Sequence, residues 1–414
     1  MMPPQPFFSV VIPTKNRPSL LRDALWSAVH QDFSDYEVIV SDNFNDASTR
    51  ETAAPFLDDR RVRYIRTGAG LPMPAHWEWA TAQARGRYIL VVTDRSVLMQ
   101  GALTRIHRAL GAYGDDIAVC SWRWSLFEEA AGILYGDGMG GGRDRGRDTA
   151  TVLSSERIAR AFVDHSGEYP FALPRGLNSC YRHDAAQRIR DRLGELFAPV
   201  SPDFTSAFLL LAHIPGVLHI DDALFISQGL RVSNGGRGVA ATCAPYLETL
   251  ATTHAYDHVP IKAAIVENVI FNDFLAVQRR AGGYLAGVRA NWVEYFVACY
   301  RELLEKEGAG LLGAAPLADM FAAWEAALAG SDAATQAEVA ARLSRLGSLR
   351  AKALLKRTPL GPVLIGLKRR VAASRPWGSS ARYQSALIAA GFEAPGHPTL
   401  SIAVRANGEQ SRRP

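Results

Sequence analysis

Three short polar clusters in this sequence carry side chains that could do chemistry: Thr14-Lys15-Asn16, Ser41-Asp42-Asn43 and Thr93-Asp94-Arg95. Each one follows an apolar run of strand length. An arginine fork suits a diphosphate, and a carboxylate can accept a proton. A further carboxylate, Asp203, stands in Ser-Pro-Asp-Phe before an apolar stretch. These residue types are those of a site that binds an anionic ligand and moves a proton.

The elements between the clusters predict that the clusters meet. Apolar strand-length runs alternate with stretches whose apolar residues recur at helical spacing, and short links join them. Such alternation predicts a parallel sheet with right-handed crossovers, in which ligands bind beyond the carboxyl ends of the strands. We expect strands over 7–14, 36–40, 62–66, 88–92 and 117–122, and helices over 16–31, 75–84 and 101–113, the first of them capped by Asn16 and opened by Pro18.

The rest of the chain predicts a more helical organisation. Residues 154–164 show a helical pattern, and 197–212 predict a loop that becomes an apolar helix with Pro202 and Asp203 at its start. Strands are expected over 217–220 and 224–227, and helices over 246–307 and 316–349. The glycine-rich run 136–147 predicts a mobile loop. We divide the chain into a first domain (1–240), a helical domain (241–345) and a basic extension with a disordered tail (346–414).

Composition excludes several protein classes. The 414 residues are 48% hydrophobic and 21% charged, which is ordinary for a globular protein and excludes a collagen-like, coiled-coil or mainly disordered chain. The four cysteines are widely separated, and His254 and His258 have no third partner, so neither a disulfide framework nor a zinc site is predicted. We find neither a membrane-spanning run nor a signal peptide in MMPPQPFF, so we expect a cytoplasmic protein.

The stretch FSVVIPTKNRPSLLRDALWSAVHQDFSDYEVIVSDNFNDAST resembles the opening of family 2 of the inverting, nucleotide-sugar-dependent glycosyltransferases, which have the GT-A fold. The resemblance covers residues 7–110 strongly and 170–235 weakly, and its specificity comes from several motifs in combination. These are Pro13-Thr14-Lys15-Asn16-Arg17, Gln31-Asp32-Phe33, Asp42-Asn43 and Ala84-Arg85-Gly86-Arg87-Tyr88-Ile89.

The resemblance implies a fold and a set of roles. The fold is α/β, with a GT-A type, mostly parallel sheet flanked by helices and followed by an α-helical carboxy-terminal region. Asp42 would bond the uracil edge, and Asp203 would be the catalytic base that takes the proton of the acceptor hydroxyl. The residues implied to bind the nucleotide-sugar are Pro13, Thr14, Asn16, Arg17, Asp42, Asn43, Trp77, Thr93 and Asp94.

The sequence departs from the family at the metal motif. Relatives have an acid after the fourth strand where this chain has Arg95, and that acid helps to hold a divalent metal that steadies the departing diphosphate. Arginine cannot bind a cation, but it can pair with a diphosphate. Three interpretations stay open: Arg95 acts as a catalytic residue in place of Mn²⁺ or Mg²⁺, Asp94 alone holds the metal, or the site is inactive.

The assigned residues also have structural alternatives. Asp42 could end a strand and cap the next helix, and Asp203 could be an ordinary helix-start residue at the positive end of the dipole. Trp77 could pack in the core as part of an amphipathic helix. Asp221 and Asp222, which compete with Asp203 for the role of base, are predicted in a turn after a strand.

A basic segment follows these elements. Residues 339–392 contain eleven Lys and Arg residues and no Asp or Glu, so they contribute +11 to a chain whose net charge is +5. Within this segment, 349–370 mixes apolar and basic residues, which could dock on an anionic membrane at the inner face or pack on the catalytic domain. Nucleic-acid binding is not predicted, because interleaved aromatic residues are lacking.

The sequence therefore predicts a glycosyltransferase of polysaccharide or glycan biosynthesis. Its partners would be a nucleotide-sugar donor, with UDP as the nucleotide, and a saccharide or lipid-linked acceptor. An inactive relative acting as a binding or assembly subunit is the alternative that Arg95 and Ser96 support. A nucleotidyltransferase would need a glycine-rich loop after the first strand, and residues 14–18 contain no glycine.

Overall fold

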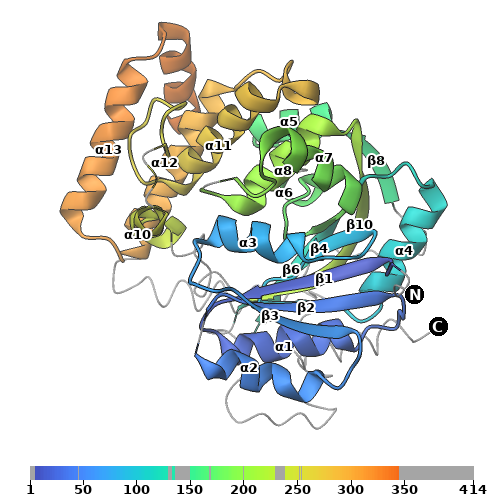
Figure 1. The fold of residues 1–414 in the computed structure, drawn as a ribbon. Helices are drawn as coiled ribbons and strands as arrows, with labels where there is room; N and C mark the ends of the chain where they lie inside the picture. Colours follow the sequence, from blue (N-terminus) through green and yellow to red (C-terminus); the bar gives the residue numbers. More distant parts are fainter. Residues whose placement is uncertain are drawn as a thin grey trace, which may run out of the picture.

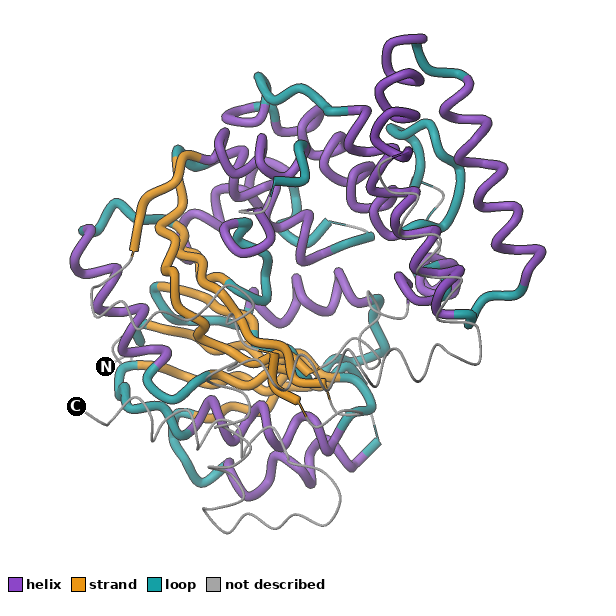
Figure 2. The backbone as a smooth tube through the Cα atoms, turned by 180° about the vertical axis from the view of Figure 1, so that it is seen from behind, coloured by secondary structure: helices purple, strands orange, loops and turns teal. Residues whose placement is uncertain are grey.

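A mixed β-sheet runs through the centre of the protein, between two layers of helices (Figures 1 and 2). The computed structural model describes residues 5–44, 46–128, 133–135, 150–166, 169–198, 200–228, 238–250, 252 and 254–344. The strands are β1 (Phe8–Thr14), β2 (Tyr36–Asp42), β3 (Val62–Arg66), β4 (Tyr88–Val91), β5 (Ser96–Leu98), β6 (Val119–Glu128), β7 (Ile133–Tyr135), β8 (Ala150–Ser154), β9 (Ser179–Arg182) and β10 (Gly216–Gln228).

The helices cover both faces of this sheet (Figure 1). They are α1 (Pro18–Val29), α2 (Ala47–Ala53), α3 (Met73–Ala82), α4 (Ala102–Tyr113), α5 (Ser155–Val163), α6 (Tyr169–Ala172), α7 (His183–Leu193), α8 (Pro202–His213), α10 (Ala244–Thr249), α11 (Val266–Ala281), α12 (Trp292–Ala309) and α13 (Ala314–Ala329). The predicted elements of the first 113 residues are all present, with ends shifted by one to a few residues.

The sheet is mostly parallel, as predicted, with one unpredicted interior strand. The strand order is β3-β2-β1-β4-β9-β6-β10-β5, and β3, β2, β1 and β4 run parallel to one another. β9 enters between β4 and β6 and is antiparallel to both. β6 and β10 are parallel neighbours. β9 therefore joins the amino-terminal strands to the later ones in one sheet.

Two hydrophobic cores lie on opposite faces of the sheet. One joins α1 and α4 to the strands, and the other joins α3, α5, α7 and α8 to the strands. Every residue of β1 and β2 is buried because both faces are covered. This double coverage is why FSVVIPT is a continuous apolar run and not an alternating pattern.

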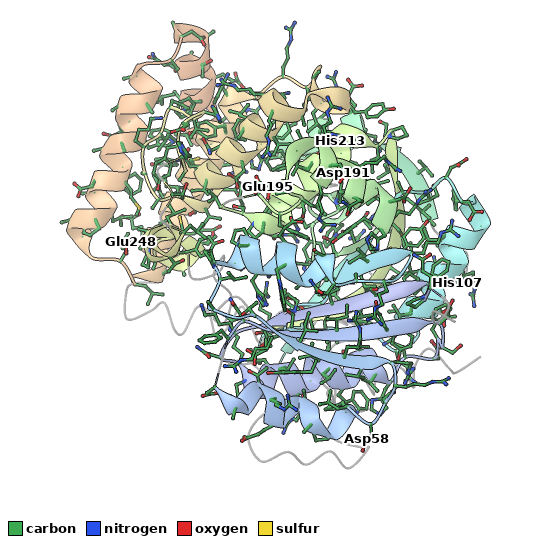
Figure 3. All side chains as sticks on the ribbon, viewed as in Figure 1. Asp58, His107, Asp191, Glu195, His213 and Glu248 are labelled. Atoms are coloured by element: carbon green, nitrogen blue, oxygen red, sulfur yellow. The ribbon has the colours of Figure 1, made fainter. Side chains whose placement is uncertain are left out.

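The later helices extend the second core. Phe274 of α11 packs against Phe162 of α5 and Phe208 of α8, with ring centroids 5.3 and 5.2 Å apart. An ion pair of 2.9 Å joins Arg280 of α11 to Glu195, which is labelled in Figure 3. The helical region thus shares a core with the sheet region, and the division at residue 240 stays a prediction. Residues 346–414 lie outside the described residues.

Two local predictions are wrong. Arg17, not Asn16, occupies the cap position of α1; its side chain makes no capping bond, and Asn16 has a φ of +55° that turns the chain out of β1. Pro18 opens the helix, as expected. Asp221 and Asp222 lie inside β10 and not in a turn, at a register irregularity where Arg123 and Arg105 pair with them at 2.7 and 2.9 Å.

Three further features of the sequence concern the histidine pair, the glycine-rich run and the search for membrane-spanning helices. Nδ1 of His254 lies 2.7 Å from Asp257, and Nδ1 of His258 lies 2.9 Å from Arg279, so the two histidines have separate partners. The run 136–147 lies outside the described residues. Among the described helices, none has the length and apolar character needed to cross a bilayer.

Gly86 lets β1 approach the turn before β4. Its backbone N–H donates to Ser9 Oγ at 2.8 Å. A Cβ atom at this position would lie 2.6 Å from the Ser9 backbone nitrogen and 2.7 Å from the Phe8 carbonyl carbon. Since both neighbours are backbone of a buried strand, they cannot move aside cheaply.

We expect Gly86→Ala to lower the free energy of unfolding by about 1–3 kcal/mol, because the added methyl group overpacks β1. Urea denaturation measures this loss. Gly111→Ala in α4 is the control, since its Cβ would meet nothing within 4 Å. The control should stabilise the helix by about 0.5–1 kcal/mol. Equal stabilities of the two variants would contradict the close approach.

His76 of α3 ties the second helical layer to β2. Its Nε2 lies 2.9 Å from Ser41 Oγ, and its side chain is buried. Burial, together with the nearby Lys15 charge, lowers the pKa of His76 to about 4. The unfolded chain therefore binds a proton near pH 6.5 that the folded protein does not accept.

We expect the contribution of His76 to the free energy of unfolding to be fully present above pH 6.5. It should be lost as the pH drops toward 4, with a total loss of roughly 3 kcal/mol. His76→Gln keeps a hydrogen-bonding group and cannot titrate, so its stability should depend less steeply on pH. Thermal unfolding between pH 4.5 and 7.5 compares the two. His30→Gln, which removes an exposed imidazole, is the control. Parallel curves for wild type and His76→Gln would refute the assignment.

Candidate active site

The three polar clusters lie together at one edge of the sheet. The Thr14 hydroxyl donates to Asp94 Oδ2 at 3.1 Å, and the Asn43 backbone N–H donates to the Thr14 carbonyl at 3.1 Å. The cause is topology: β1 lies between β2 and β4, all three are parallel, and their carboxyl ends therefore meet. The prediction that these clusters share one edge is confirmed.

Asp94 is a buried carboxylate with cations around it. Its residue is 5% exposed, and Arg17 NH1 lies 3.3 Å from Oδ1. Burial raises the pKa of Asp94, while the Arg17 charge and the Thr14 hydrogen bond act in the opposite direction. Arg17, which precedes α1, is thus aimed at the end of β4. Asp94 and Arg17 form the floor of the candidate site.

Arg95 interacts with a serine and, electrostatically, with two carboxylates. Its guanidinium NH1 donates to Ser227 Oγ of β10 at 2.6 Å, which fixes the side chain across the sheet edge. Burial lowers the pKa of Arg95, and the negative charges of Asp203 and then Asp94 oppose that shift. Arg95 therefore connects the strand-end cluster with Asp203, 108 positions later in the sequence. Sequence reasoning did not find Ser227.

Asp203 lies in the first turn of α8, as predicted, and is half-buried. Burial raises the pKa of Asp203, and the charge of Arg175 is the largest influence that opposes this, ahead of Arg95. The Arg175 guanidinium lies over the Trp124 ring at 4.6 Å and the Phe204 ring at 5.2 Å. Arg175 was not predicted. It precedes β9, the strand that the sequence analysis also missed.

Asp42 is fully buried at the end of β2. The Tyr64 hydroxyl donates to its Oδ2, and Arg66 Nε lies 3.9 Å from the same oxygen. Tyr64 and Arg66 were not predicted. Tyr64 and Arg66 stand two apart on β3, so their side chains share one face, and Arg66 is in register with Asp42.

A surface beside Asp42 continues the site. Phe44 is 52% exposed, has a φ of +57°, and lies 4.8 Å from the Arg66 guanidinium. Asn43 exchanges two hydrogen bonds of 2.8 Å with the backbone of Leu71. Non-glycine residues at positive φ are uncommon, and they concentrate at functional sites. An exposed aromatic ring and an arginine at this edge can hold a planar base and a phosphate.

The remaining predicted residues divide into two groups. Pro13 is buried in β1 opposite Ser41, Thr93 lies at the turn with its hydroxyl 2.9 Å from Ser96 Oγ, and Asn16 is exposed at the edge. Trp77 instead packs in the core, 6% exposed, with its ring edge-to-face against Phe197. The segment between α7 and α8 covers the face of α3 that carries Trp77. Trp77 is therefore a core residue, which is the structural alternative given for it above.

The groups around Asp94 do not fit a divalent cation. Divalent metals in such sites prefer several carboxylate or imidazole ligands, whereas Asp94 is paired with Arg17 and lies close to Arg95. A metal ion there would lie beside two guanidinium groups. Within the described ranges, no group of three or more His, Cys, Asp or Glu side chains is arranged to hold a metal ion.

Sequence comparison finds a family similarity in the amino-terminal part of the chain. Residues 9–135 match the family model described as glycosyl transferase family 2. A curated relative from Campylobacter jejuni, GalNAc(5)-diNAcBac-PP-undecaprenol beta-1,3-glucosyltransferase, is 33% identical over 118 residues. That match covers 28% of this chain and 38% of the relative, so the chain spans less than half the length of the relative.

Solved structures give a looser similarity. S. aureus TarS 1–349 in complex with UDP-GlcNAc has a TM-score of 0.44 at 14% identity, covering 77% of this chain and 90% of that chain. The mannosyltransferase PcManGT from Pyrobaculum calidifontis, in complex with GDP-Man and Mn²⁺, has a TM-score of 0.37 at 12% identity, covering 99% and 88%. Similarity at this level carries no information on what this chain binds. Residues 9–135 are thus similar to glycosyl transferase family 2.

Proposed function

We propose that this protein is an inverting glycosyltransferase that moves a sugar from a UDP-sugar to a hydroxyl group of a saccharide or lipid-linked acceptor. One observation carries the proposal: Asp94 and Arg95, in the turn between β4 and β5, and Asp203, at the start of α8, form one cluster of alternating charge in which Arg95 interacts with both carboxylates. The match of residues 9–135 to the family model supports the same activity. Family membership by itself does not identify the donor or the acceptor.

The donor would lie along the ends of β1, β2 and β4. Asp42 and Phe44 would recognise the uracil ring, and Thr14 and Asp94 would contact the ribose and the diphosphate. Arg17 and Arg95 would face the diphosphate, since a guanidinium fork pairs with phosphate oxygens through two hydrogen bonds. We include Pro13, Asn16, Asn43 and Thr93 as edge residues of this donor site and leave Trp77 out.

The transfer step needs one base and one fixed cation. The acceptor hydroxyl oxygen attacks the anomeric carbon from the face opposite the diphosphate, and its proton passes to the Asp203 carboxylate. The bond between the anomeric carbon and the diphosphate oxygen breaks, and UDP leaves with the bonding electron pair. Arg95, held by Ser227, would stabilise the charge on the departing diphosphate in the role that relatives give to a metal.

The environment of Asp203 suits a base of this kind. A carboxylate in water is a weak proton acceptor, and burial raises the pKa of Asp203 so that the group binds a proton more readily. The Arg175 and Arg95 charges act the other way and keep the carboxylate available in its ionised form. Transfer should therefore weaken as the pH falls through this raised pKa.

The acceptor belongs to the same proposal. The name of the curated relative describes a lipid diphosphate acceptor, and a basic segment such as 349–370 would suit an acceptor at an anionic membrane surface. That segment lies outside the described residues. We propose peripheral contact with the inner membrane face and a catalytic unit that includes residues 1–240 and the helical region 241–345.

We expect UDP to bind equally well with Mn²⁺ and with a chelator, because Arg17 and Arg95 supply the positive charge. Calorimetric titration of UDP under both conditions measures this. Arg95→Ala should weaken UDP binding on the order of 10- to 100-fold, in line with about 1.5–3 kcal/mol for hydrogen bonds to a charged group. Binding that requires Mn²⁺ would instead make Asp94 a metal ligand. A lack of UDP binding in both conditions would favour the inactive-relative alternative.

We expect Asp203→Asn to abolish sugar transfer and hydrolysis of the UDP-sugar while UDP affinity stays unchanged, because the amide cannot accept the proton. Release of UDP from a panel of UDP-sugars measures turnover. Asp184→Asn is the matched control, since Asp184 is also a carboxylate in the first turn of a helix, α7. The control should keep full turnover. Normal turnover in Asp203→Asn would refute the role of base.

A further inference from the structure

The backbone just before Asp203 is held in a strained conformation. Val200 has a φ of +93°, in a region that a β-branched residue rarely adopts. Such a conformation persists only where neighbouring groups over-determine it. The groups that do so here come from far along the chain.

Two side chains of the helical region bind this strained turn. Asp273 of α11 accepts the Ser201 backbone N–H on Oδ2 at 2.9 Å, and the Tyr246 hydroxyl of α10 donates to the Val200 carbonyl at 2.6 Å. The apolar part of the turn joins the same elements, since Val200 packs in a small cluster with Leu247 and Val269. The helical region thus binds both the carbonyl oxygen and the N–H of the one peptide unit that joins Val200 to Ser201.

The other end of the segment is fixed from the sheet region. Glu78 of α3 accepts the backbone N–H groups of Leu196 and Phe197 on Oε2, each at 2.8 Å. Arg190 pairs with the same carboxylate. The segment that leads to Asp203 is therefore bound at its start by α3 and at its end by α10 and α11.

Burial of the Asp273 carboxyl group costs free energy, so this residue is not explained by packing alone. The residue is 3% exposed, and burial raises the pKa of Asp273 to about 8, with the nearby Asp203 charge acting in the same direction. A buried polar group is retained at a net cost unless its hydrogen bonds repay it. Here the bond it makes is to the backbone two residues before the proposed base.

The helix that carries Asp273 is itself anchored. Glu302 of α12 accepts the backbone N–H groups of Val266 and Glu267 at the start of α11, at 2.8 and 2.9 Å. Lys306, fully buried, pairs with Glu302 at 2.7 Å. The first turn of α11 is thereby fixed to α12, so Asp273 is presented from a rigid support.

We propose that Asp273 and Tyr246 are positioning residues that hold the strained turn at Val200 and so set the place of Asp203 in the active site. The helical region would then be part of the catalytic apparatus and not an independent appendage. This inference rests on the proposed function, because it takes Asp203 to be the base.

The test compares three variants of the full chain. Asp273→Ala removes the acceptor for Ser201. Asp273→Asn keeps an acceptor oxygen in the same place. Asn268→Ala is the matched control, because Asn268 is buried on the same helix and its amide binds the Ile261 and Ala263 carbonyls, away from the turn.

Two readouts are needed. Hydrogen exchange of the backbone amides in 196–204 reports whether the turn is held. The kcat and KM for UDP release from the best of the tested UDP-sugars, with calorimetric UDP affinity, report whether catalysis depends on it. We expect Asp273→Ala to exchange at least tenfold faster there and to lose kcat on the order of 10- to 100-fold with unchanged UDP affinity. Asp273→Asn should restore most of the loss, and Asn268→Ala should change neither readout.

Different outcomes would contradict the positioning role of Asp273 and the proposed glycosyltransferase function. Unchanged exchange, or faster exchange with a wild-type kcat, in Asp273→Ala would overturn the positioning role. Equal losses in Asp273→Ala and Asn268→Ala would also overturn it, because they would indicate general destabilisation. An active Asp203→Asn variant, or wild-type protein that neither binds UDP nor releases it from any UDP-sugar, would refute the proposed function whatever Asp273→Ala does.

Discussion

Burial of the Asp94 carboxylate at the end of β4 is the constraint on which the site depends. A carboxylate removed from water without partners costs several kcal/mol, so the chain must bring hydrogen-bond donors and positive charge to it. Thr14 from β1 and Arg17 from the start of α1 do so directly. Arg95 adds a second positive charge, and that charge must itself be held, which Ser227 of β10 accomplishes. One buried charge therefore links the first, fourth and last strands of the sheet.

Each buried charge in the site needs a partner, and this need explains why the site includes residues well beyond the segment that matches the family model. Ser227, Asp203 and Arg175 all follow residue 135, where the family match ends. β9 brings the later strands beside β4, and Arg175, just before β9, lies over Phe204 at the start of α8. Asp94 and Arg95 are neighbours in the sequence, but their other partners, Arg17, Ser227 and Asp203, are brought to them only by the tertiary fold.

Much of the fold could be predicted from local pattern. β1 to β4 and their helices follow from apolar runs and helical spacing, and the meeting of Thr14, Asn43 and Asp94 follows from parallel topology. The start of α8 at Pro202 followed from its helix-start residues. Asn16 was assigned as a cap because its residue type suits one, whereas the chain uses it to turn with positive φ.

The residues that sequence analysis missed share one physical property: their roles arise from contacts across the chain. Arg175 acts on Asp203 through space, Tyr64 reaches Asp42 across a strand pair, and Asp273 binds a backbone N–H 72 positions away. Periodicity and motif spacing report only on residues that are close in the sequence, so they do not predict contacts between distant segments. β9 is four residues long and was missed for a related reason, since its burial comes from neighbours on both sides and not from its own pattern.

An arginine in place of an acidic metal ligand changes how the positive charge is maintained. A bound metal can leave with the product, but a guanidinium belongs to the chain and keeps its charge at every working pH. Under the proposed function, Asp94 and Asp203, which both interact electrostatically with Arg95, would offset that charge when no donor is bound. In the proposed function, this offset requires both carboxylates to stay in place near Arg95. The rigid support of the turn before Asp203 is consistent with that requirement, because a mobile Asp203 would leave Arg95 without one of its two counter-charges.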